Sequence, residues 1–281
     1  METSNDHFEA WLGRSEERRD TLVAAQAERM AALLDREAAP GEGDPLPPLW
    51  HWTYFAPTAR QSEIGPDGHP KRGGFMPPIA LPRRMWAGGR LNFHAPLHVG
   101  ESVSRTTEIL SIKEKTGSQG KLVFLTLKHS LSNDAGLALE EEQDIVYRQP
   151  STTALPPPAT ETPAADWREG FSADPVVLFR YSALTFNAHR IHYDLPYATG
   201  EEGYPGLVVH GPLTATLLLD AFMRRTGRQP KSFSFRGQAP LFAGRAMAIC
   251  GKAGEASGTF ELWAEGPGGY RAMAASVTTG D

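Results

Sequence analysis

Three histidines fall close together in the second half of the chain: His189, His192 and His210. Imidazole has an unperturbed pKa near neutrality, so a histidine clustered with polar partners beside a glycine turn predicts general acid/base chemistry. Gly211-Pro212 follows directly and opens an apolar segment. Proline in a first helical turn costs no hydrogen bond, and the free N–H groups and partial positive charge of a helix start can hold a developing oxyanion.

Motifs of several common enzyme classes are absent from the sequence. It contains no G-x-S-x-G elbow, no Walker loop, no G-x-G-x-x-G after a strand and no H-E-x-x-H. These absences count against serine hydrolases, nucleotide phosphotransferases and nicotinamide enzymes. A zinc or iron site built from His189, His192, Asp194 and His210 is an alternative, but no second ligand set of defined spacing accompanies them. We expect neither a metal nor another cofactor.

The elements that must position these residues follow from hydrophobic periodicity and turn residues. In the second half we predict a strand, a His-rich turn, one long apolar helix and four strands, over residues 176–181, 187–194, 212–224, 231–236, 242–251, 258–264 and 270–277. In the first half we predict an amphipathic helix, an aromatic strand, a Gly/Pro-rich loop and three strands, over residues 15–37, 49–55, 57–82, 91–113, 121–132 and 138–148.

A short internal repeat relates the two halves. Residues 95–100 read Ala-Pro-Leu-His-Val-Gly and residues 239–244 read Ala-Pro-Leu-Phe-Ala-Gly, at an offset of 144. Both precede a run of strands, so duplication of one α+β unit is the preferred interpretation. A helix precedes the strands of the second copy, whereas the Gly/Pro-rich loop takes that place in the first. We therefore expect one half to carry the site.

Length and composition agree with two folded domains. The chain has 281 residues, of which 40% are hydrophobic and 22% charged. Residues 149–166 contain five prolines among Ser, Thr and Ala, which predicts an extended linker. The expected domains are therefore residues 1–148 and 167–281. The single cysteine, Cys250, excludes an internal disulfide and is expected to be a buried, inert thiol.

Charge is unevenly distributed along the chain, although the net charge is only −5. Residues 1–44 are acidic, whereas residues 221–254 hold seven cations and no acid. That basic segment suits an anionic ligand, or else forms a solvated face. No nucleic-acid motif accompanies it, so nucleic acid is not expected as a partner. No signal peptide or membrane span is recognisable, which predicts a cytoplasmic protein that does not bind membranes.

The His-rich segment resembles the MaoC-like, or hydratase-2, enzymes of the hotdog fold. Their pattern D-x-N-P-[apolar]-H corresponds to Asn187-x-His189-Arg190-Ile191-His192, and the H-G at the head of their long helix corresponds to His210-Gly211. Residues 74–89, together with Phe93-His94, resemble the two-domain branch. That branch contains type-2 hydroxyacyl-thioester dehydratases and mesaconyl-C4-CoA or itaconyl-CoA hydratases. The resemblance covers residues 11–277.

The resemblance implies an α+β double hotdog, with two antiparallel sheets each associated with a helix. It places His192 as the catalytic histidine, Asn187 in the position of its acidic partner, and the Gly211 N–H as the oxyanion donor. Asparagine cannot exchange a proton, so Asn187 is expected only to hold the attacking water. His192 is then expected to remove the proton from that water, and the α-carbon is expected to receive its proton from the same histidine or from water.

The implied function is hydration of an unsaturated acyl-CoA thioester, such as itaconyl-CoA or mesaconyl-C4-CoA to citramalyl-CoA. Two alternative functions are dehydration of longer 3-hydroxyacyl thioesters and non-catalytic binding of acyl-CoA. Assembly into a homo-oligomer is compatible with each of them. Arg236 and Arg245 are the candidates for binding CoA phosphates, and Arg83 or Arg84 for the free carboxylate. His94 and His210 complete the expected pocket, whereas His51, His69, His98 and His129 are expected to be structural or exposed.

Overall fold

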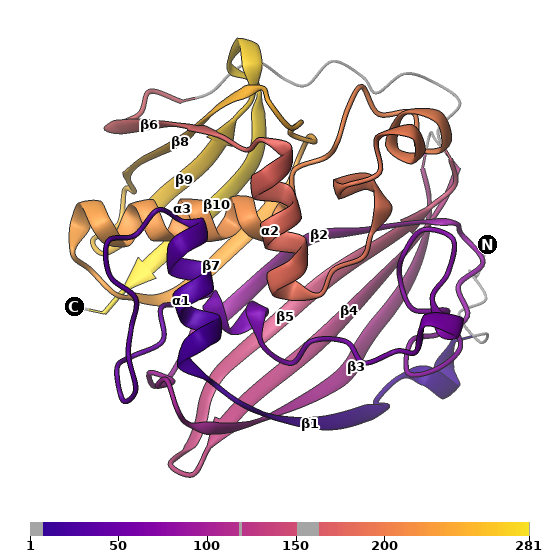
Figure 1. Cartoon of the computed structure of the whole chain (residues 1–281), viewed down its shortest axis with the longest axis horizontal. Helices are drawn as coiled ribbons and strands as arrows, with labels where there is room; N and C mark the ends of the chain where they lie inside the picture. The colour runs from indigo at the N-terminus through magenta and orange to yellow at the C-terminus, as the bar shows by residue number, and fades with distance from the viewer. Residues whose placement is uncertain (1–7, 118–119, 151–162, 281) are drawn as a thin grey trace.

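The computed structural model describes residues 8–117, 120–150 and 163–280. The first half supplies strands β1 (Ser15–Thr21), β2 (Arg83–Phe93), β3 (Ser102–Gly117), β4 (Gly120–Asn133) and β5 (Gly136–Arg148). The second half supplies β6 (Trp167–Ser172), β7 (Pro230–Gly237), β8 (Ala246–Ala253), β9 (Thr259–Glu265) and β10 (Arg271–Thr279). They form one antiparallel sheet in the order β1-β3-β4-β5-β2-β7-β10-β9-β8-β6 (Figure 1).

The two halves of this sheet meet where β2 pairs with β7. Gly88 lies opposite Arg236, and Asn92 lies opposite Ser232. A Cβ atom at Gly88 would lie 2.5 Å from the carbonyl oxygen of Phe235, so only glycine allows the two strands to approach this closely. The two predicted antiparallel sheets are therefore joined edge to edge, with five strands from each half.

Equivalent hydrogen bonds confirm the internal repeat. The N–H groups of His94 and Ala95 donate to Ala138 O, and those of Gln238 and Ala239 donate to Ala272 O. One turn later, Gly100 N–H donates to Leu22 O, just as Gly244 N–H donates to Ala173 O. Each of these acceptors, Leu22 and Ala173, comes just before a helix. The two copies of the repeat therefore place a helix at the same point of the fold.

These equivalent helices are α1 (Ala24–Leu33) and α2 (Pro175–Thr185), which pack against each other (Figure 1). The third helix, α3 (Gly211–Thr226), packs on β7, β8, β9 and β10. Gly227 ends α3 with a left-handed φ of 67°, and Leu213 and Leu218 in its interior are fully buried. The predicted helix at 212–224 is confirmed.

The first half has no counterpart of α3 in the described residues. Leu46 N–H donates to Leu97 O in the first copy as Val209 N–H donates to Leu241 O in the second. From Val209 the chain enters α3, whereas from Leu46 it forms only the 3-10 turn η2 (Trp50–Thr53) and then the Gly/Pro-rich segment. The sheet β2 to β5 is therefore covered by loops where the second half has a helix.

Three predicted segments are wrong in type, namely 15–21, 176–181 and, as described below, 49–55. Residues 15–21 form the edge strand β1, which pairs antiparallel with β3 from Ser15 opposite Glu108 to Thr21 opposite Ser102, and the helix begins only at Ala24. The predicted strand at 176–181 is helix α2. Asp174 caps it by accepting the Val177 N–H at 2.8 Å, and Pro175 occupies the first turn, so capping overrides the strand propensity of Val176 and Val177.

Other boundaries also differ from the predictions. The aromatic segment 49–55 is the turn η2, because Leu49 has a φ of 72°. The single strand predicted at 91–113 is interrupted between Phe93 and Ser102 by the Ala-Pro-Leu-His-Val-Gly turn. The four strands of the second half and the loop 57–82 are confirmed, apart from β8 beginning at Ala246. Residues 151–162 of the predicted linker lie outside the described residues.

Short helical turns complete the described elements: η1 (Glu9–Trp11), η3 (Gln61–Glu63), η4 (Arg190–His192), the π-helical η5 (Tyr197–Glu201) and η6 (Pro267–Gly269). Within the described ranges, no helix has the length and apolarity that crossing a bilayer requires.

Candidate active site

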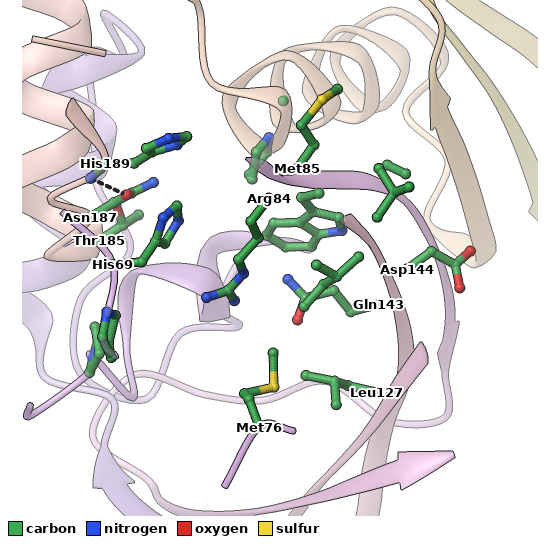
Figure 2. Close-up of a pocket in the computed structure, with 18 of the residues that line it drawn as sticks. His69, Met76, Arg84, Met85, Leu127, Gln143, Asp144, Thr185, Asn187 and His189 are labelled. Atoms are coloured by element: carbon green, nitrogen blue, oxygen red, sulfur yellow. Dashed lines mark hydrogen bonds between the residues drawn. The ribbon is translucent and has the colours of Figure 1, made fainter. Parts of the chain in front are cut away.

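A cavity of about 2390 Å³ lies where the first half has loops in place of a helix (Figure 2). It is lined by the loop after η2, by β2 and β5, by the segment 185–193 and by the start of α3. Pockets for small ligands usually enclose about 300–1000 Å³, so this cavity suits a long ligand. Both halves of the chain contribute to it.

His192 lies in this cavity with one ring nitrogen fixed. Its Nδ1–H donates to the carbonyl oxygen of Val208 at 2.7 Å, which leaves Nε2 with its lone pair free. The residue is only 7% exposed, and burial lowers its pKa from 6.5 to about 4. At neutral pH the ring is therefore uncharged and able to accept a proton.

His210 supports His192 from behind. The two rings stack with centroids 3.6 Å apart and planes inclined by 19°. His210 is fully buried, its Nε2 is 2.9 Å from the hydroxyl oxygen of Ser182, and burial lowers its pKa well below the ordinary value. It does not line the cavity, so the structure places this predicted pocket residue in a supporting position.

Asn187 follows the left-handed residue Phe186, which ends α2 at a φ of 49°. Its Oδ1 accepts the His189 N–H at 3.0 Å (Figure 2), so its amide NH2 is the group left to donate toward the cavity. Asn187 and His192 are thus brought to the same cavity, as the motif predicts.

Gly211 is the first residue of α3 and lines the same cavity. The first N–H groups of a helix have no partner within the helix, and the described part of the chain offers Gly211 N–H no other acceptor. His210 precedes it in an extended conformation, with φ −62° and ψ 130°. This donor therefore remains available to a ligand, at the positive end of the helix dipole.

The two neighbouring arginines on β2 differ in their surroundings. Arg84 lines the cavity without an ion pair or hydrogen bond to any other described residue, and its guanidinium points into the cavity near His69 (Figure 2). Arg83 lies outside the cavity, and its Nε is 3.0 Å from Glu202 Oε2. Of the two predicted candidates for a carboxylate, the structure brings only Arg84 to the site.

Of the other predicted binding residues Arg236, Arg245 and His94, only Arg236 lines the cavity. Arg236 lines the cavity and is exposed. Arg245 lies outside it, with its guanidinium 5.3 Å from the centre of the Phe242 ring. His94 is exposed and its Nε2 is 3.0 Å from Glu140 Oε2, so it does not reach the cavity. The sequence around His94 predicted that this residue lines the pocket, but the turn after β2 places it outside.

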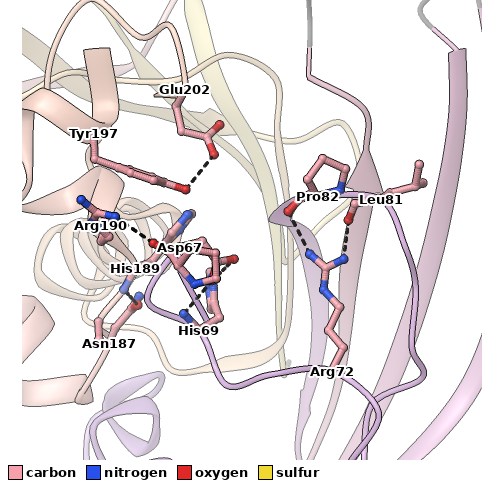
Figure 3. A network of polar contacts seen from close by, with 12 residues as sticks. Asp67, His69, Arg72, Leu81, Pro82, Asn187, His189, Arg190, Tyr197 and Glu202 are labelled. Carbon is pink, nitrogen blue, oxygen red and sulfur yellow. Dashed lines mark hydrogen bonds and ion pairs between the residues drawn. The ribbon is translucent and has the colours of Figure 1, made fainter. Parts of the chain in front are cut away.

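His69, which was expected to be structural or exposed, lines the cavity beside His189 with ring centroids 4.2 Å apart. His189 in turn lies 5.4 Å from His192. Asp67 holds His69 from behind, with Oδ2 3.1 Å from Nδ1 (Figure 3). The sequence shows Asp67-Gly68-His69 within the Gly/Pro-rich loop. It does not show that this segment contacts residues more than 100 positions away, because that contact arises only from the tertiary fold.

Close packing fixes that loop on the His-rich segment. Arg190 N–H donates to Asp67 O, and the Arg190 guanidinium donates to Pro66 O, both at 2.9 Å. Gly68 has a φ of 92°, and a Cβ atom there would lie 1.7 Å from Ala188 O. The loop can therefore dock only if position 68 is glycine.

A Gly68→Ala substitution is expected to detach the loop, whereas Gly73→Ala is its matched control. Gly73 has a similar φ of 96° but nothing within 4 Å of the added methyl group. Both variants carry the left-handed backbone cost of about 1–2 kcal/mol, but only Gly68→Ala adds a collision. Protease cleavage within residues 57–82 should rise severalfold more for Gly68→Ala; equal cleavage of the two variants would disprove the packing argument.

Within the described ranges, no three His, Cys, Asp or Glu side chains are grouped as a metal ion would require. Ring contacts and hydrogen bonds account for the packing of His69, His189, His192 and His210.

Comparison with known proteins identifies the family of this chain. The family model for hydroxyacyl-thioester dehydratase type 2 matches residues 49–243. Mesaconyl-C(4)-CoA hydratase of Chloroflexus aurantiacus is 47% identical over 280 residues, covering 99% of each chain. The mitochondrial hydroxyacyl-thioester dehydratase type 2 of Schizosaccharomyces pombe is 31% identical over 247 residues, covering 78% of this chain and 80% of its own.

Solved structures support the fold. A MaoC-like dehydratase superimposes with a TM-score of 0.73 at 16% identity, covering 96% of this chain and 99% of its own. A Mycobacterium tuberculosis protein with a double hotdog fold gives a TM-score of 0.59 at 14% identity, covering 96% of both chains. The predicted α+β double hotdog is confirmed, and the chain belongs to the hydroxyacyl-thioester dehydratase type 2 family.

Proposed function

We propose that this protein is a hydro-lyase that adds water to the double bond of a C5 dicarboxylic acyl-CoA thioester, with mesaconyl-C4-CoA as the first candidate. The observation that carries the proposal is the meeting of three groups at one cavity: the free Nε2 of His192, the unpaired N–H of Gly211 and the unpaired guanidinium of Arg84. The 47% identity to a mesaconyl-C(4)-CoA hydratase supports the same substrate class.

In the proposed reaction His192 Nε2 takes a proton from water while the water oxygen bonds to the β-carbon. The π electrons of the double bond move to the thioester oxygen, and Gly211 N–H stabilises the resulting enolate. The amide of Asn187 orients the water. Protonation of the α-carbon then completes the addition of one water molecule.

Arg84 is the residue that we propose to bind the free carboxylate of a dicarboxylic acyl group. In mesaconyl-C4-CoA the free carboxylate is attached to the β-carbon, the atom that water attacks, so its cation must lie close to the base. Arg84 is the candidate, because it lines the same cavity as His192 and its guanidinium points into that cavity near His69 (Figure 2). Arg236, on the same cavity, is proposed to bind a CoA phosphate.

Turnover of three thioesters tests this function. Purified protein is incubated with mesaconyl-C4-CoA, itaconyl-CoA and crotonyl-CoA, while enoyl absorbance and free thiol are followed together. We expect the mesaconyl absorbance to fall, a product heavier by one water and no thiol release. Thiol release would indicate a thioesterase instead, and unchanged absorbance with all three would refute the hydratase.

Replacement of Arg84 should change substrate preference. A charge-assisted hydrogen bond contributes about 1.5–3 kcal/mol, so Arg84→Met should lower kcat/KM for mesaconyl-C4-CoA by about 10- to 100-fold and leave crotonyl-CoA within about threefold. Arg83→Met should not alter the ratio, because Glu202 already pairs with that guanidinium. Equal losses for both substrates would remove Arg84 from carboxylate recognition.

The family and the cavity volume also favour a second candidate, dehydration of longer 3-hydroxyacyl thioesters. The same catalytic groups would then catalyse loss of water. Turnover of 3-hydroxyacyl-CoA substrates of increasing chain length distinguishes this dehydratase from the C5 dicarboxylic hydratase. A cytoplasmic location and assembly into homo-oligomers are kept as predictions.

A further inference from the structure

Hydration of a double bond needs two proton transfers, and His192 is the one titrating group assigned to them above. A proton must leave the water oxygen, and a proton must reach the α-carbon. His192 serves the first transfer. The position that is a carboxylate in the related motif is Asn187 here, and an amide does not exchange a proton at neutral pH. The proton that reaches the α-carbon comes either from protonated His192 or water, or from a second titrating group in the cavity.

The Asp67-His69 pair has the geometry of such a group. Asp67 Oδ2 accepts the Nδ1–H of His69 at 3.1 Å, while Oδ1 accepts the His69 backbone N–H at 3.0 Å (Figure 3). These bonds keep Asp67 ionised, with its pKa well below the ordinary value despite burial. His69 Nε2 is then the ring atom left for a ligand, and the side chain is 21% exposed.

Contacts between its loop and the His-rich segment fix the position of His69 in the cavity. Its loop is anchored by Arg190 and by the close approach of Gly68 to Ala188, so the ring is brought from the first half against the motif of the second. His129, also in the cavity wall, differs because both of its ring nitrogens already have partners, Thr107 Oγ1 and Gln143 Oε1. Within the described structure, His69 keeps a free ring nitrogen and lies beside His189, whose ring in turn contacts that of His192.

We propose that His69, held by Asp67, is the general acid that delivers the proton to the α-carbon, and that it takes the place of the carboxylate missing at Asn187. This proposal rests on the proposed hydratase function. His192 gains the proton of water as the C–O bond forms. His69 Nε2 gives its proton to the α-carbon as the enolate collapses; solvent then removes the proton from His192 and returns one to His69.

The charges around His69 favour its protonation only when a dicarboxylic substrate is bound. Burial lowers the pKa of the free His69 imidazole below its ordinary value; the Asp67 carboxylate opposes this shift, whereas the cations Arg84 and Arg72 add to it. The neighbouring ring of His189 stays neutral, with a pKa of about 2. A substrate carboxylate against Arg84 would offset that positive charge, so its binding shifts His69 toward the imidazolium form.

Hydrogen exchange of a saturated substrate analogue tests this assignment directly. Methylsuccinyl-C4-CoA has α-protons but no double bond, so enzyme in D2O can exchange the α-protons without any hydration step. We expect wild type to introduce deuterium, His69→Gln to be at least about 100-fold slower, and His192→Gln to stay within about tenfold of wild type. Exchange that survives in His69→Gln and disappears in His192→Gln would overturn the proposal.

The pH dependence of kcat supplies a readout that a structural role would not change. His69→Gln should lower kcat by about 10²–10⁴-fold, whereas Asp67→Asn, which keeps an Oδ1 acceptor for the loop, should move the alkaline limb to lower pH by at least about one unit. His98→Gln is the matched control, because His98 Nδ1 pairs with Glu101 at 3.1 Å outside the cavity. An alkaline limb unchanged in Asp67→Asn would reject His69 as the acid.

These outcomes also separate this inference from the proposed function. If wild type hydrates mesaconyl-C4-CoA and His69→Gln keeps wild-type kcat, only the role of His69 fails. If wild type hydrates none of the three thioesters, the function itself fails. Should His69→Gln not fold, the exchange and pH profile of Asp67→Asn decide the question.

Discussion

The His192→Gln variant is expected to lose about 10²–10⁴-fold in kcat while its KM changes by less than about threefold. Glutamine fills similar space and can still donate to Val208 O, but it cannot accept a proton at neutral pH. The loss therefore falls on the chemical step and not on thioester binding. Steady-state kinetics with mesaconyl-C4-CoA, together with binding of the saturated analogue, measures both quantities.

The pH profile of wild type provides a second test of the same residue. Burial lowers the pKa of His192 to about 4, so the ring is neutral and basic at every pH above that value. On the acid side of the profile, activity should therefore fall only as the pH drops toward 4, where His192 becomes protonated. The acid limb of kcat/KM would lie near 6.5 for an ordinary histidine. An acid limb at that higher pH, or near-normal kcat in His192→Gln, would exclude His192 as the base.

The second large effect is expected from removal of one backbone N–H. Gly211→Pro deletes the proposed oxyanion donor, and loss of such a donor costs about 10²–10³-fold in kcat. The helix should tolerate the change, because the N–H of its first residue has no helical partner and His210 has the extended conformation that precedes proline.

Gly211→Ala is the matched control because it keeps the N–H. The nearest atom to the added methyl group would be Trp86 O at 3.9 Å, an ordinary contact distance. We expect Gly211→Ala to retain kcat within about fivefold and both variants to unfold within a few degrees of wild type. Equal kcat values for the alanine and proline variants would show that Gly211 N–H does not stabilise the enolate.

Local signals in the sequence predicted the parts of the fold that local chemistry determines. Pro212 and Gly227 delimit α3, and the repeated Ala-Pro-Leu turns mark equivalent points of the two halves. The segment 176–181 begins with the strand-forming residues Val176 and Val177, but the cap at Asp174 and the proline at 175 start helix α2 there. Strand β1 was predicted as helix because a charged edge strand lacks the apolar alternation of a buried one.

The candidate site was predictable only where it lies within one segment of the chain. Asn187, His192 and Gly211 follow from the His-rich motif and the helix start, and the structure brings them to one cavity. His69 belongs to a loop whose position depends on Gly68 docking at Ala188, a contact without a local sequence signal. The choice between Arg83 and Arg84 likewise depends on Glu202, which is distant in sequence but close in space.

A crystal structure of the His192→Gln variant with bound citramalyl-CoA tests the central claim most directly, because the product carries both the thioester and the added hydroxyl. We predict the thioester oxygen about 2.7–3.1 Å from Gly211 N, with the hydroxyl on the β-carbon facing residue 192 and the carboxylate against Arg84. A thioester bound away from Gly211, or a hydroxyl directed away from residue 192, would contradict this account.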